Sequence, residues 1–275
     1  MYEAYWKLTE KPFENTPDPR FLFQSSQHEE GIGRLLYCVR ESKGAGMLSG
    51  IFGCGKTLIS QILMRELKHE RYNVALIVNP LLKADELLLS IAIRLGTQGL
   101  PTRRGELLTS VVLDSLTGVL ENNARDGRTT VVIIDEAHVI HDPLVWEHLR
   151  LLLNAQWENR FLLTLLLIGQ PELKTIIEAD KPLAQRIAVS YHLTTFKPED
   201  TAAYVLHRLR VAGNKNGPHP FTEEAIRLIH RKSGGIPRRI NHLCDLALLT
   251  GYSKQATAIN ETLIQEVSED IEGGY

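Results

Sequence analysis

The chain has 275 residues, of which 43% are hydrophobic and 23% charged, and its formal net charge is −2. This composition is typical of a globular protein that is long enough to bury a core and to form two domains. The slightly acidic balance argues against a generally basic nucleic-acid binder. The longest apolar run, residues 161–169, is about half of the roughly 20 residues that cross a bilayer, so we expect no membrane span.

Three cysteines, Cys38, Cys54 and Cys244, lie far apart in the sequence and show no metal-ligand spacing. An odd number of scattered cysteines suits a reducing compartment, so we expect free thiols. The first residues lack a basic segment followed by an apolar one, which argues against a secretory signal. Together these features predict a cytoplasmic protein.

Residues 1–24 are rich in aromatic residues and prolines, among them Pro12, Pro17 and Pro19. Prolines at this density disfavour regular helix, so we predict an extended N-terminal linker that lies over the core. Ser25 and Ser26 then precede apolar residues that share one helical face. This pattern predicts a helix that begins at the serine pair and ends at about residue 42.

The next segment is Gly50-Ile51-Phe52-Gly53-Cys54-Gly55-Lys56-Thr57, which fits the G-x-x-x-x-G-K-[ST] phosphate-binding (Walker A) loop at each fixed position. An apolar run precedes it, and apolar residues at helical spacing follow from Leu58, as the motif requires. Backbone N–H groups of such a loop surround a polyphosphate, Lys56 reaches the terminal phosphates, and Thr57 offers a hydroxyl to Mg²⁺. We therefore expect residues 50–58 to bind nucleotide; the alternative is a glycine-rich turn that binds nothing.

Apolar strands alternate with helical patterns as far as residue 196. The predicted strands span residues 46–49, 73–78, 131–134, 161–168 and 188–193, and helices are predicted over 85–95, 106–122 and 143–154. Buried strands that alternate with helices are typical of a parallel sheet covered by helices on both faces. Residues 25–196 are therefore predicted to form an α/β core with a five-stranded parallel sheet.

The pattern after residue 196 is helical only. Helices are predicted over residues 199–212, 222–231, 237–250 and 261–271. Residues 197–275 are therefore predicted to form a second, all-α domain.

A pair of carboxylates, Asp135 and Glu136, follows the predicted strand at 131–134. Asp135 would hold the Mg²⁺ water shell, and Glu136 would orient or deprotonate the water that attacks the γ-phosphate of ATP. This pair favours hydrolysis over simple binding, although two acids in a surface turn are the structural alternative. Residues 135–138 also spell a helicase-like Asp-Glu-Ala-His box, but a single α/β core leaves no room for the second core of a helicase.

Several motifs occur together in an order that resembles AAA+ ATPases: residues 50–57, Asp135-Glu136, Gly169-Gln170, residues 185–187 and residues 235–238. A narrower set, residues 12–13, 17–21, 25–28, 167–173 and 185–187, resembles the ExeA family of general secretion pathway ATPases over nearly the whole chain. The resemblance implies a P-loop NTPase (AAA+) fold in which the all-α domain is a lid. Members of that family usually continue into a membrane span and a peptidoglycan-binding domain, so we expect a standalone member or the cytoplasmic part of a longer protein.

The resemblance also implies roles for polar residues outside the loop. Gln170 matches the sensor-1 position, which contacts the γ-phosphate or the attacking water. Arg238 matches the sensor-2 arginine, which clamps the phosphates when the lid closes, and its neighbour Arg239 is the alternative for this role. Asn79 matches the residue that holds the catalytic glutamate away from water until a partner binds; a simple turn residue is the alternative.

Arg186 matches the arginine that AAA+ proteins supply in trans to the neighbouring subunit, an arginine finger that stabilises charge on the γ-phosphate. An intramolecular ion pair that stabilises the turn is the alternative role. Phe23 and His28 match positions that could line the adenine site, although core packing is the simpler role for Phe23.

These observations predict an Mg·ATP-dependent AAA+ ATPase that hydrolyses ATP to ADP and phosphate. It is expected to act as a homo-oligomeric switch or remodeller, a ring or filament with active sites at subunit interfaces, in secretion or envelope assembly on a protein client that the sequence does not identify. The alternative is a DNA-associated ATPase regulator of the transposition type, favoured by Arg103 and Arg104 and disfavoured by the acidic net charge. A non-hydrolysing scaffold is disfavoured by Glu136.

Overall fold

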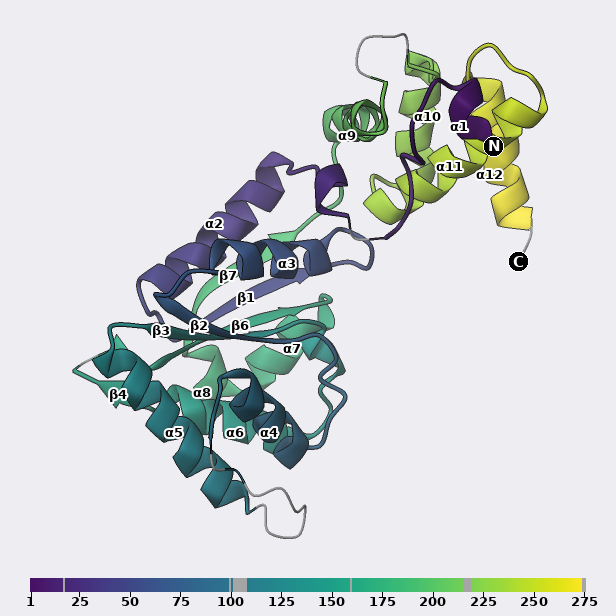
Figure 1. Cartoon of the computed structure of the whole chain (residues 1–275). Coiled ribbons are helices and arrows are strands. Elements are labelled where there is room, and N and C mark those ends of the chain that lie inside the picture. Colours follow the sequence, from purple (N-terminus) through teal and green to yellow (C-terminus); the bar gives the residue numbers. More distant parts are fainter. Residues whose placement is uncertain (17, 99, 101–107, 159, 215–218, 274–275) are drawn as a thin grey trace. The chain divides into compact units, whose positions relative to one another are not determined.

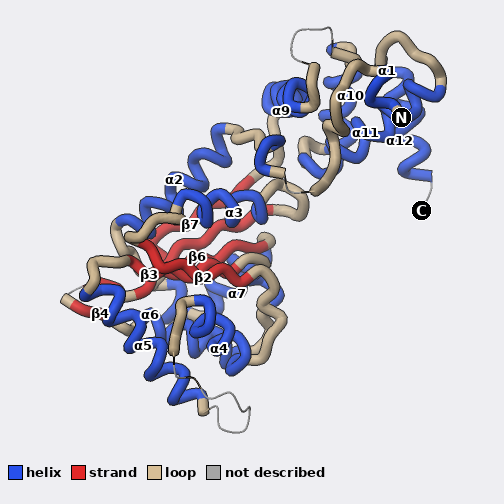
Figure 2. Tube along the Cα trace, viewed as in Figure 1, coloured by secondary structure: helices blue, strands red, loops and turns tan. Residues whose placement is uncertain are grey.

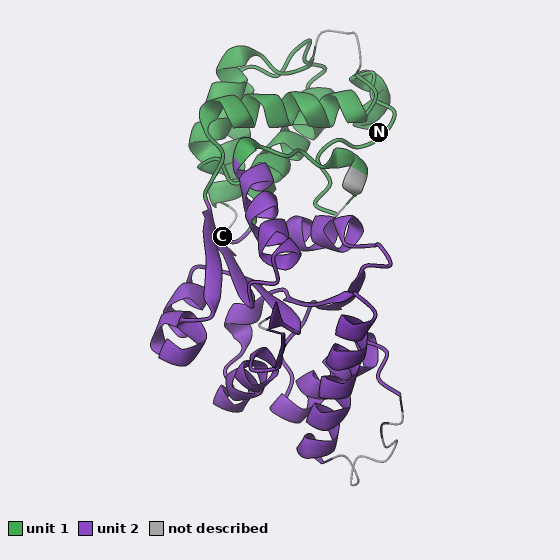
Figure 3. Cartoon of the chain, turned by 90° about the vertical axis from the view of Figure 1, so that its left-hand side faces the viewer, with its two compact units in different colours: residues 1–26, 53–55, 194–275 green, residues 27–52, 56–193 purple. Residues whose placement is uncertain are grey.

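The computed structural model describes residues 1–273 apart from residues 17, 99, 101–107, 159 and 215–218. The chain forms two compact units (Figure 3). Residues 27–52 and 56–193 form one, which we call the α/β unit, and residues 1–26, 53–55 and 194–275 form the other, which we call the helical unit. The first residues of the chain therefore group with its last residues.

The α/β unit contains a parallel sheet with the strand order β2-β3-β6-β1-β7. Its strands are drawn in red in Figure 2. Its strands are β1 (Ala45–Gly50), β2 (Tyr72–Ile77), β3 (Thr129–Ile134), β6 (Leu163–Gly169) and β7 (Ile187–Leu193). Neighbouring strands pair in parallel throughout, and β1 and β6 are buried along their whole length. The predicted five-stranded parallel sheet is confirmed.

Helices cover both faces of this sheet (Figure 1). On one face lie α2 (Ser26–Arg40) and α3 (Lys56–Glu66), and on the other lie α4 (Ala84–Arg94), α5 (Thr109–Arg125), α6 (Pro143–Leu153), α7 (Glu172–Ala179) and α8 (Lys181–Ala184). One hydrophobic core joins the second group to the sheet. Burial of the apolar stripe of each helix against the sheet is the main source of stability for such layers.

The segment before β6 differs from the prediction of one strand over residues 161–168. Arg160–Phe161 form a separate strand, β5, which pairs antiparallel with β4 (Gln156–Trp157). The ring of Phe161 packs over Gly44, where a Cβ would lie 3.2 Å from that ring. The run of apolar residues therefore contains a break, because Phe161 packs beside the sheet and β6 begins only at Leu163. The short helices α7 and α8 were also not predicted.

The helical unit consists of α9 (Pro198–Val211), α10 (Glu223–Ser233), α11 (Pro237–Ser253) and α12 (Glu261–Gly273), together with α1 (Tyr2–Tyr5) and the 3-10 helix η1 (Pro19–Phe21). The first residues pack into its core. Trp6 Nε1 donates to the carbonyl oxygen of Leu248 (2.9 Å), and the Phe13 ring meets the Phe221 ring edge-on at 6.0 Å between centroids.

The prediction of a linker over the α/β core is therefore wrong for residues 1–24. Prolines limit this segment to short helical turns, but they do not prevent its aromatic side chains from being buried in the helical unit. Buried Arg208 fixes the path of the segment, because its guanidinium donates to the carbonyl oxygens of Pro12 and, at 2.8 Å, Glu14. Among the described residues, no helix combines the length and the apolar character needed to cross a membrane.

Candidate nucleotide-binding site

The predicted phosphate-binding loop connects β1, which ends at Gly50, to α3, which begins at Lys56. Gly53 and Gly55 have φ angles of +84° and +98°, a region that side chains rarely tolerate, so the curl of the loop requires glycine at both positions. Lys56 is 4% exposed, and its Nζ donates to the carbonyl oxygen of Ile51 at 3.0 Å. The strand, loop and helix therefore follow one another as the motif requires.

Asp135 follows β3 and is completely buried. Its Oδ2 lies 3.1 Å from the hydroxyl of Ser60 in α3, and the same hydroxyl lies 2.8 Å from the carbonyl oxygen of Thr57. The hydroxyl-bearing residue Thr57 is exposed in the first turn of α3. A buried carboxylate beside the start of the loop helix is an oxygen donor set of the kind that Mg²⁺ prefers.

Glu136 has φ +54° and ψ +34°, the left-handed conformation that is uncommon for a residue with a side chain. Its backbone N–H donates to Asp135 Oδ1 at 2.9 Å, which helps to hold this conformation. The Glu136 side chain is 33% exposed. Strained backbone at the end of a strand is often found at functional sites.

Gln170 follows β6, the strand next to β3. Its backbone N–H lies 3.3 Å from Nδ1 of His138, and the same Nδ1 lies 3.4 Å from Oε2 of Glu136. The structure therefore connects two residues with predicted roles through His138, for which the sequence analysis predicted no role. The signal was present, because His138 is the last residue of the Asp-Glu-Ala-His string.

Asn79 lies two residues after β2 and is exposed. Its Oδ1 accepts a hydrogen bond from the backbone N–H of Leu81 at 3.3 Å. This bond is the one that a turn residue makes, so the structure supports the alternative role and the switch role stays a prediction.

Arg186 precedes the first residue of β7, whereas the loop follows the last residue of β1. The two strands are parallel, with Ala45 opposite Ile187. Arg186 therefore lies at the amino-terminal end of these strands, whereas the loop lies at their carboxyl-terminal end. Six residues of strand correspond to roughly 20 Å at about 3.3 Å per residue. The Arg186 guanidinium donates to the carbonyl oxygen of Pro182 (2.9 Å) and to Oδ1 of Asn154, both of which are uncharged.

Arg238 and Arg239 lie in the first turn of α11, in the helical unit. The backbone N–H of Arg238 is 3.4 Å from the carbonyl oxygen of Gly53, which groups with the same unit. Arg239 instead lines a cavity of 480 Å³ among α10, α11 and α12. Of the two arginines, Arg238 is therefore the one beside the loop residue.

The comparisons with known proteins match the part of the chain that carries these residues. A family model described as an AAA domain matches residues 39–177, which include the end of β1, both carboxylates and Gln170. The chain belongs to the AAA domain family. It is also 36% identical, along 99% of its length, to general secretion pathway protein A of Aeromonas hydrophila, and it spans 49% of that protein. The resemblance that the sequence motifs indicated is thereby confirmed.

Solved structures of other proteins share the fold of this chain. The ORC2 protein of Aeropyrum pernix, in ADPNP–ADP complexes, is 16% identical with a TM-score of 0.68, covering 96% of this chain and 72% of that one. The RuvB Holliday junction branch migration motor of Thermotoga maritima is 18% identical with a TM-score of 0.59, covering 94% of this chain and 73% of that one. At these identities the likeness establishes the fold alone.

The remaining predictions for this AAA domain protein concern the adenine-site residues Phe23 and His28 and the DNA-contacting arginines. Phe23 packs against the rings of Phe196 (5.7 Å) and Tyr204 (5.8 Å) in the helical unit, which is the core-packing role. His28 is buried in α2. Arg103 and Arg104 lie outside the described residues, so the interpretation that they contact DNA stays a prediction.

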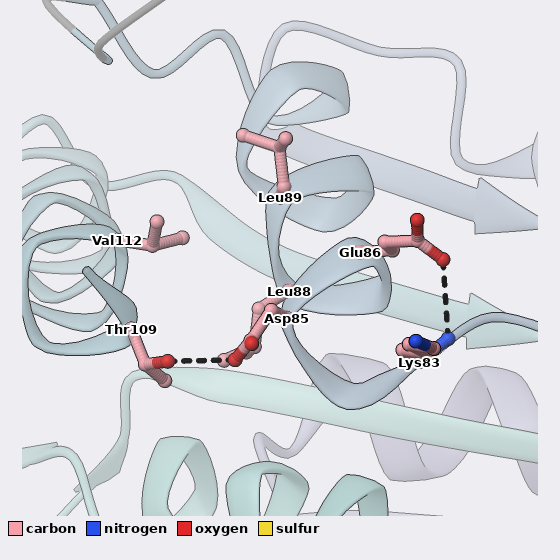
Figure 4. A pocket seen from close by; sticks show the side chains of 7 residues that line it. All are labelled: Lys83, Asp85, Glu86, Leu88, Leu89, Thr109 and Val112. Atoms are coloured by element: carbon pink, nitrogen blue, oxygen red, sulfur yellow. Dashed lines mark hydrogen bonds between the residues drawn. The ribbon is translucent and has the colours of Figure 1, made fainter. Parts of the chain in front are cut away.

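The AAA domain contains another hollow, of 290 Å³, between the first turns of α4 and α5 (Figure 4). The charged groups there make helix-end contacts. Thr109 Oγ1 donates to Asp85 Oδ1 (2.6 Å), and the backbone N–H of Lys83 donates to Glu86 Oε2 (3.3 Å). These bonds fix the start of α4 and join it to α5, which is a structural role.

The three cysteines of the AAA domain protein are buried, and none forms a disulfide among the described residues. Burial raises the pKa of the Cys38 thiol to about 11, and burial also raises the pKa of Cys244. Thiols with raised pKa values are poor nucleophiles, so these two are packing residues. Among the described residues, no cluster of three or more His, Cys, Asp or Glu side chains is placed to hold a metal ion.

Proposed function

We propose that the chain is an Mg²⁺-dependent ATPase that hydrolyses ATP to ADP and phosphate and acts as a homo-oligomeric switch or remodeller. The position of Asp135 supports this proposal most directly. Its buried carboxylate lies 3.1 Å from Ser60, one turn after the exposed hydroxyl residue Thr57. Two acids with a purely structural role in a turn would not need a fully buried carboxylate beside the helix that follows a phosphate-binding loop.

Each residue of the site has a role that its surroundings support. The start of α3 and the curled loop offer backbone N–H groups to phosphate, and Lys56 adds a positive charge. Thr57 and Asp135 would hold Mg²⁺, which neutralises phosphate charge when bound. Glu136, which is one third exposed, is the group that takes a proton from the attacking water.

Two further residues complete the proposed site. Gln170 is proposed to sense the γ-phosphate from the end of the strand beside β3. Arg238 is proposed to clamp the phosphates, because it is the arginine whose backbone contacts loop residue Gly53.

The location of Arg186 supports an oligomer. Arg186 and the loop of its own chain lie at opposite ends of the paired strands β7 and β1. The Arg186 guanidinium can therefore serve as an arginine finger only for a neighbouring subunit. Both acceptors that its guanidinium contacts among the described residues are uncharged, so its positive charge is available to contact a phosphate. Arginine fingers in phosphoryl transfer contribute on the order of 10³-fold or more in rate.

The cellular setting is proposed from the curated relative. General secretion pathway protein A is named for secretion, and the chain covers about half of that protein. We propose a role in assembling secretion or envelope machinery, in the cytoplasm, where buried thiols such as Cys38 and Cys244 stay reduced.

Two substitutions test this function because they separate binding from hydrolysis. Lys56→Ala removes a phosphate contact and is expected to abolish binding of a fluorescent ATP analogue. Glu136→Gln removes only the carboxylate that activates water, so it is expected to bind the analogue and to lose turnover by about 10²-fold or more. Lys68→Ala and Glu172→Gln, at exposed positions, are the matched controls. Equal loss of binding in both test variants, or unchanged turnover in Glu136→Gln, would remove Glu136 from catalysis.

A further inference from the structure

His138 lies between the strand end that carries Glu136 and the strand end that carries Gln170. It belongs to the 3-10 helix η3 (Ala137–Val139), which packs against β6 and α7. Its side chain is 12% exposed. A single ring atom, Nδ1, lies 3.3 Å from the backbone nitrogen of Gln170 and 3.4 Å from Oε2 of Glu136.

The two neighbours of Nδ1 make opposite demands on it. The N–H of Gln170 donates, so it requires a lone pair on Nδ1, which the Nε2–H tautomer of the ring supplies. The carboxylate of Glu136 accepts, so it requires a proton on Nδ1, which the other tautomer supplies. Because one atom cannot do both at once, the ring has two arrangements, and each satisfies one neighbour and releases the other.

The packing around His138 connects the ring to the end of β6. A Cβ on Gly169 would lie 3.2 Å from both the backbone nitrogen and Nδ1 of His138, and 3.0 Å from Cδ2 of Leu173. The absence of a Cβ at Gly169 therefore allows His138 to pack closely against the end of β6. A displacement of Gln170 must change its hydrogen bond to the ring, because nothing separates the two.

We propose that His138 is a positioning residue that couples Gln170 to Glu136, an inference that rests on the proposed ATPase function. While the Gln170 N–H occupies Nδ1, the Glu136 carboxylate is free to accept a proton from water. When Gln170 moves away, the ring adopts the Nδ1–H tautomer and holds Glu136 through a hydrogen bond. This assigns to His138 the restraint of the glutamate that the family resemblance implied for Asn79, whose Oδ1 accepts a hydrogen bond within its own turn.

Turnover kinetics test the coupling. His138→Leu keeps about the size of the side chain but removes Nδ1, the acceptor that positions Gln170. We therefore expect kcat to fall about 10- to 100-fold, the loss that misplacing a catalytic group by about 1 Å can cause. KM and the affinity for the ATP analogue are expected to stay within twofold. His138→Asn places an amide atom near the position of Nδ1 and is expected to recover most of the activity. His141→Leu, at an exposed position, is the control.

A double-mutant cycle separates coupling from independent effects. If His138 acts on the same step as Gln170, then His138→Leu combined with Gln170→Ala loses no more activity than the more damaging single change. Losses that multiply overturn the inference. The inference is also overturned if His138→Leu keeps the kcat of the wild type while Glu136→Gln is inactive. That result would leave the proposed function standing. A wild-type chain that binds ATP without hydrolysing it refutes the proposed function as well.

A spectroscopic measurement needs no activity. The ¹⁵N chemical shifts of a histidine ring distinguish its tautomers, and the His138 signals are identified by their loss in His138→Leu. Wild type is expected to show an average of both tautomers. Glu136→Ala removes the acceptor for Nδ1–H, so its ring is expected to shift fully to the Nε2–H tautomer. Identical shifts in wild type and Glu136→Ala would show that Nδ1 never donates to Glu136, and would overturn the inference.

Discussion

Replacing Gly235 with alanine is expected to destabilise the helical unit severely, whereas the same change at its neighbour Gly234 is expected to be mild. Both glycines have left-handed backbone, with φ angles of +61° at Gly234 and +70° at Gly235. Their surroundings differ. A Cβ on Gly234 meets no atom within 4 Å, whereas a Cβ on Gly235 would lie 2.2 Å from the carbonyl oxygen of Phe196.

The expected magnitudes follow from these surroundings. Left-handed backbone costs a residue with a Cβ about 1–2 kcal/mol, and alanine recovers about 0.5–1 kcal/mol by restricting the unfolded chain. Gly234→Ala should therefore cost about 1 kcal/mol. Gly235→Ala must also move a backbone carbonyl that cannot rotate away, and it breaks the bond from the Phe196 N–H to the Gly235 carbonyl oxygen (2.9 Å). Overpacking and a lost hydrogen bond add about 2 kcal/mol or more, giving a total of about 3 kcal/mol.

Tryptophan fluorescence can follow the helical unit alone. The chain has three tryptophans, and Trp6 belongs to the helical unit while Trp146 and Trp157 belong to the α/β unit. In a Trp146→Phe, Trp157→Phe background, urea unfolding followed through Trp6 gives the free energy of unfolding of the helical unit for each glycine variant. Equal losses in the Gly234 and Gly235 variants would refute the argument from the Phe196 carbonyl.

Four further predictions concern the site and the helical unit. Mixing Arg186→Ala with Lys56→Ala is expected to restore part of the ATPase activity that each lacks alone; mixed oligomers without any recovery would exclude an arginine finger at Arg186. Cys54 is 1% exposed, so a bulky maleimide should react with it slowly and then block nucleotide binding. Bound ATP should protect Cys54 from the reagent, and Cys54→Ser should resist inhibition. Equal inhibition of the serine variant would place the reactive thiol elsewhere. The free energy of unfolding of Glu136→Asn, from thermal unfolding, should be about 0.5–1 kcal/mol higher than that of Glu136→Gln, because asparagine tolerates left-handed backbone. Equal free energies would mean that the backbone at this position is unstrained. Burial and two neighbouring arginines lower the pKa of His207, so the unfolded chain binds a proton at this residue more readily than the folded chain. The helical unit should therefore lose stability as the pH falls through about 6.5. His207→Gln should weaken this pH dependence, and an unchanged profile of stability against pH would contradict the assignment.

The parts of the fold that were predicted correctly are those in which a local pattern has one physical meaning. Buried strands such as residues 131–134 have four apolar β-branched residues in succession, and the loop at 50–57 has glycines where its backbone must be left-handed. Periodicity also predicted the four long helices of the helical unit. The strand order was not predictable, because no local pattern in an isolated strand specifies its neighbours.

The parts that were missed depend on contacts between residues distant in sequence. The N-terminal segment looks extended by its prolines, but the partners of Trp6 and Phe13 are in α11 and beside α10, more than 200 positions later. The role of His138 depends on the strand order that places β6 beside β3. Arg186 was identified by resemblance, and only the parallel pairing of β7 with β1 shows that it faces away from its own loop.

The grouping of the first residues with the last has a consequence for synthesis of the protein. A ribosome makes Trp6 early, but the carbonyl group of Leu248 that its indole binds emerges some 240 residues later. The α/β unit can therefore fold while translation continues, whereas the helical unit must wait until its residues from Thr194 onward have been made. During that interval Trp6 and Phe13 lack their later partners Leu248 and Phe221, which makes residues 1–24 of the nascent chain a natural place for a chaperone to bind.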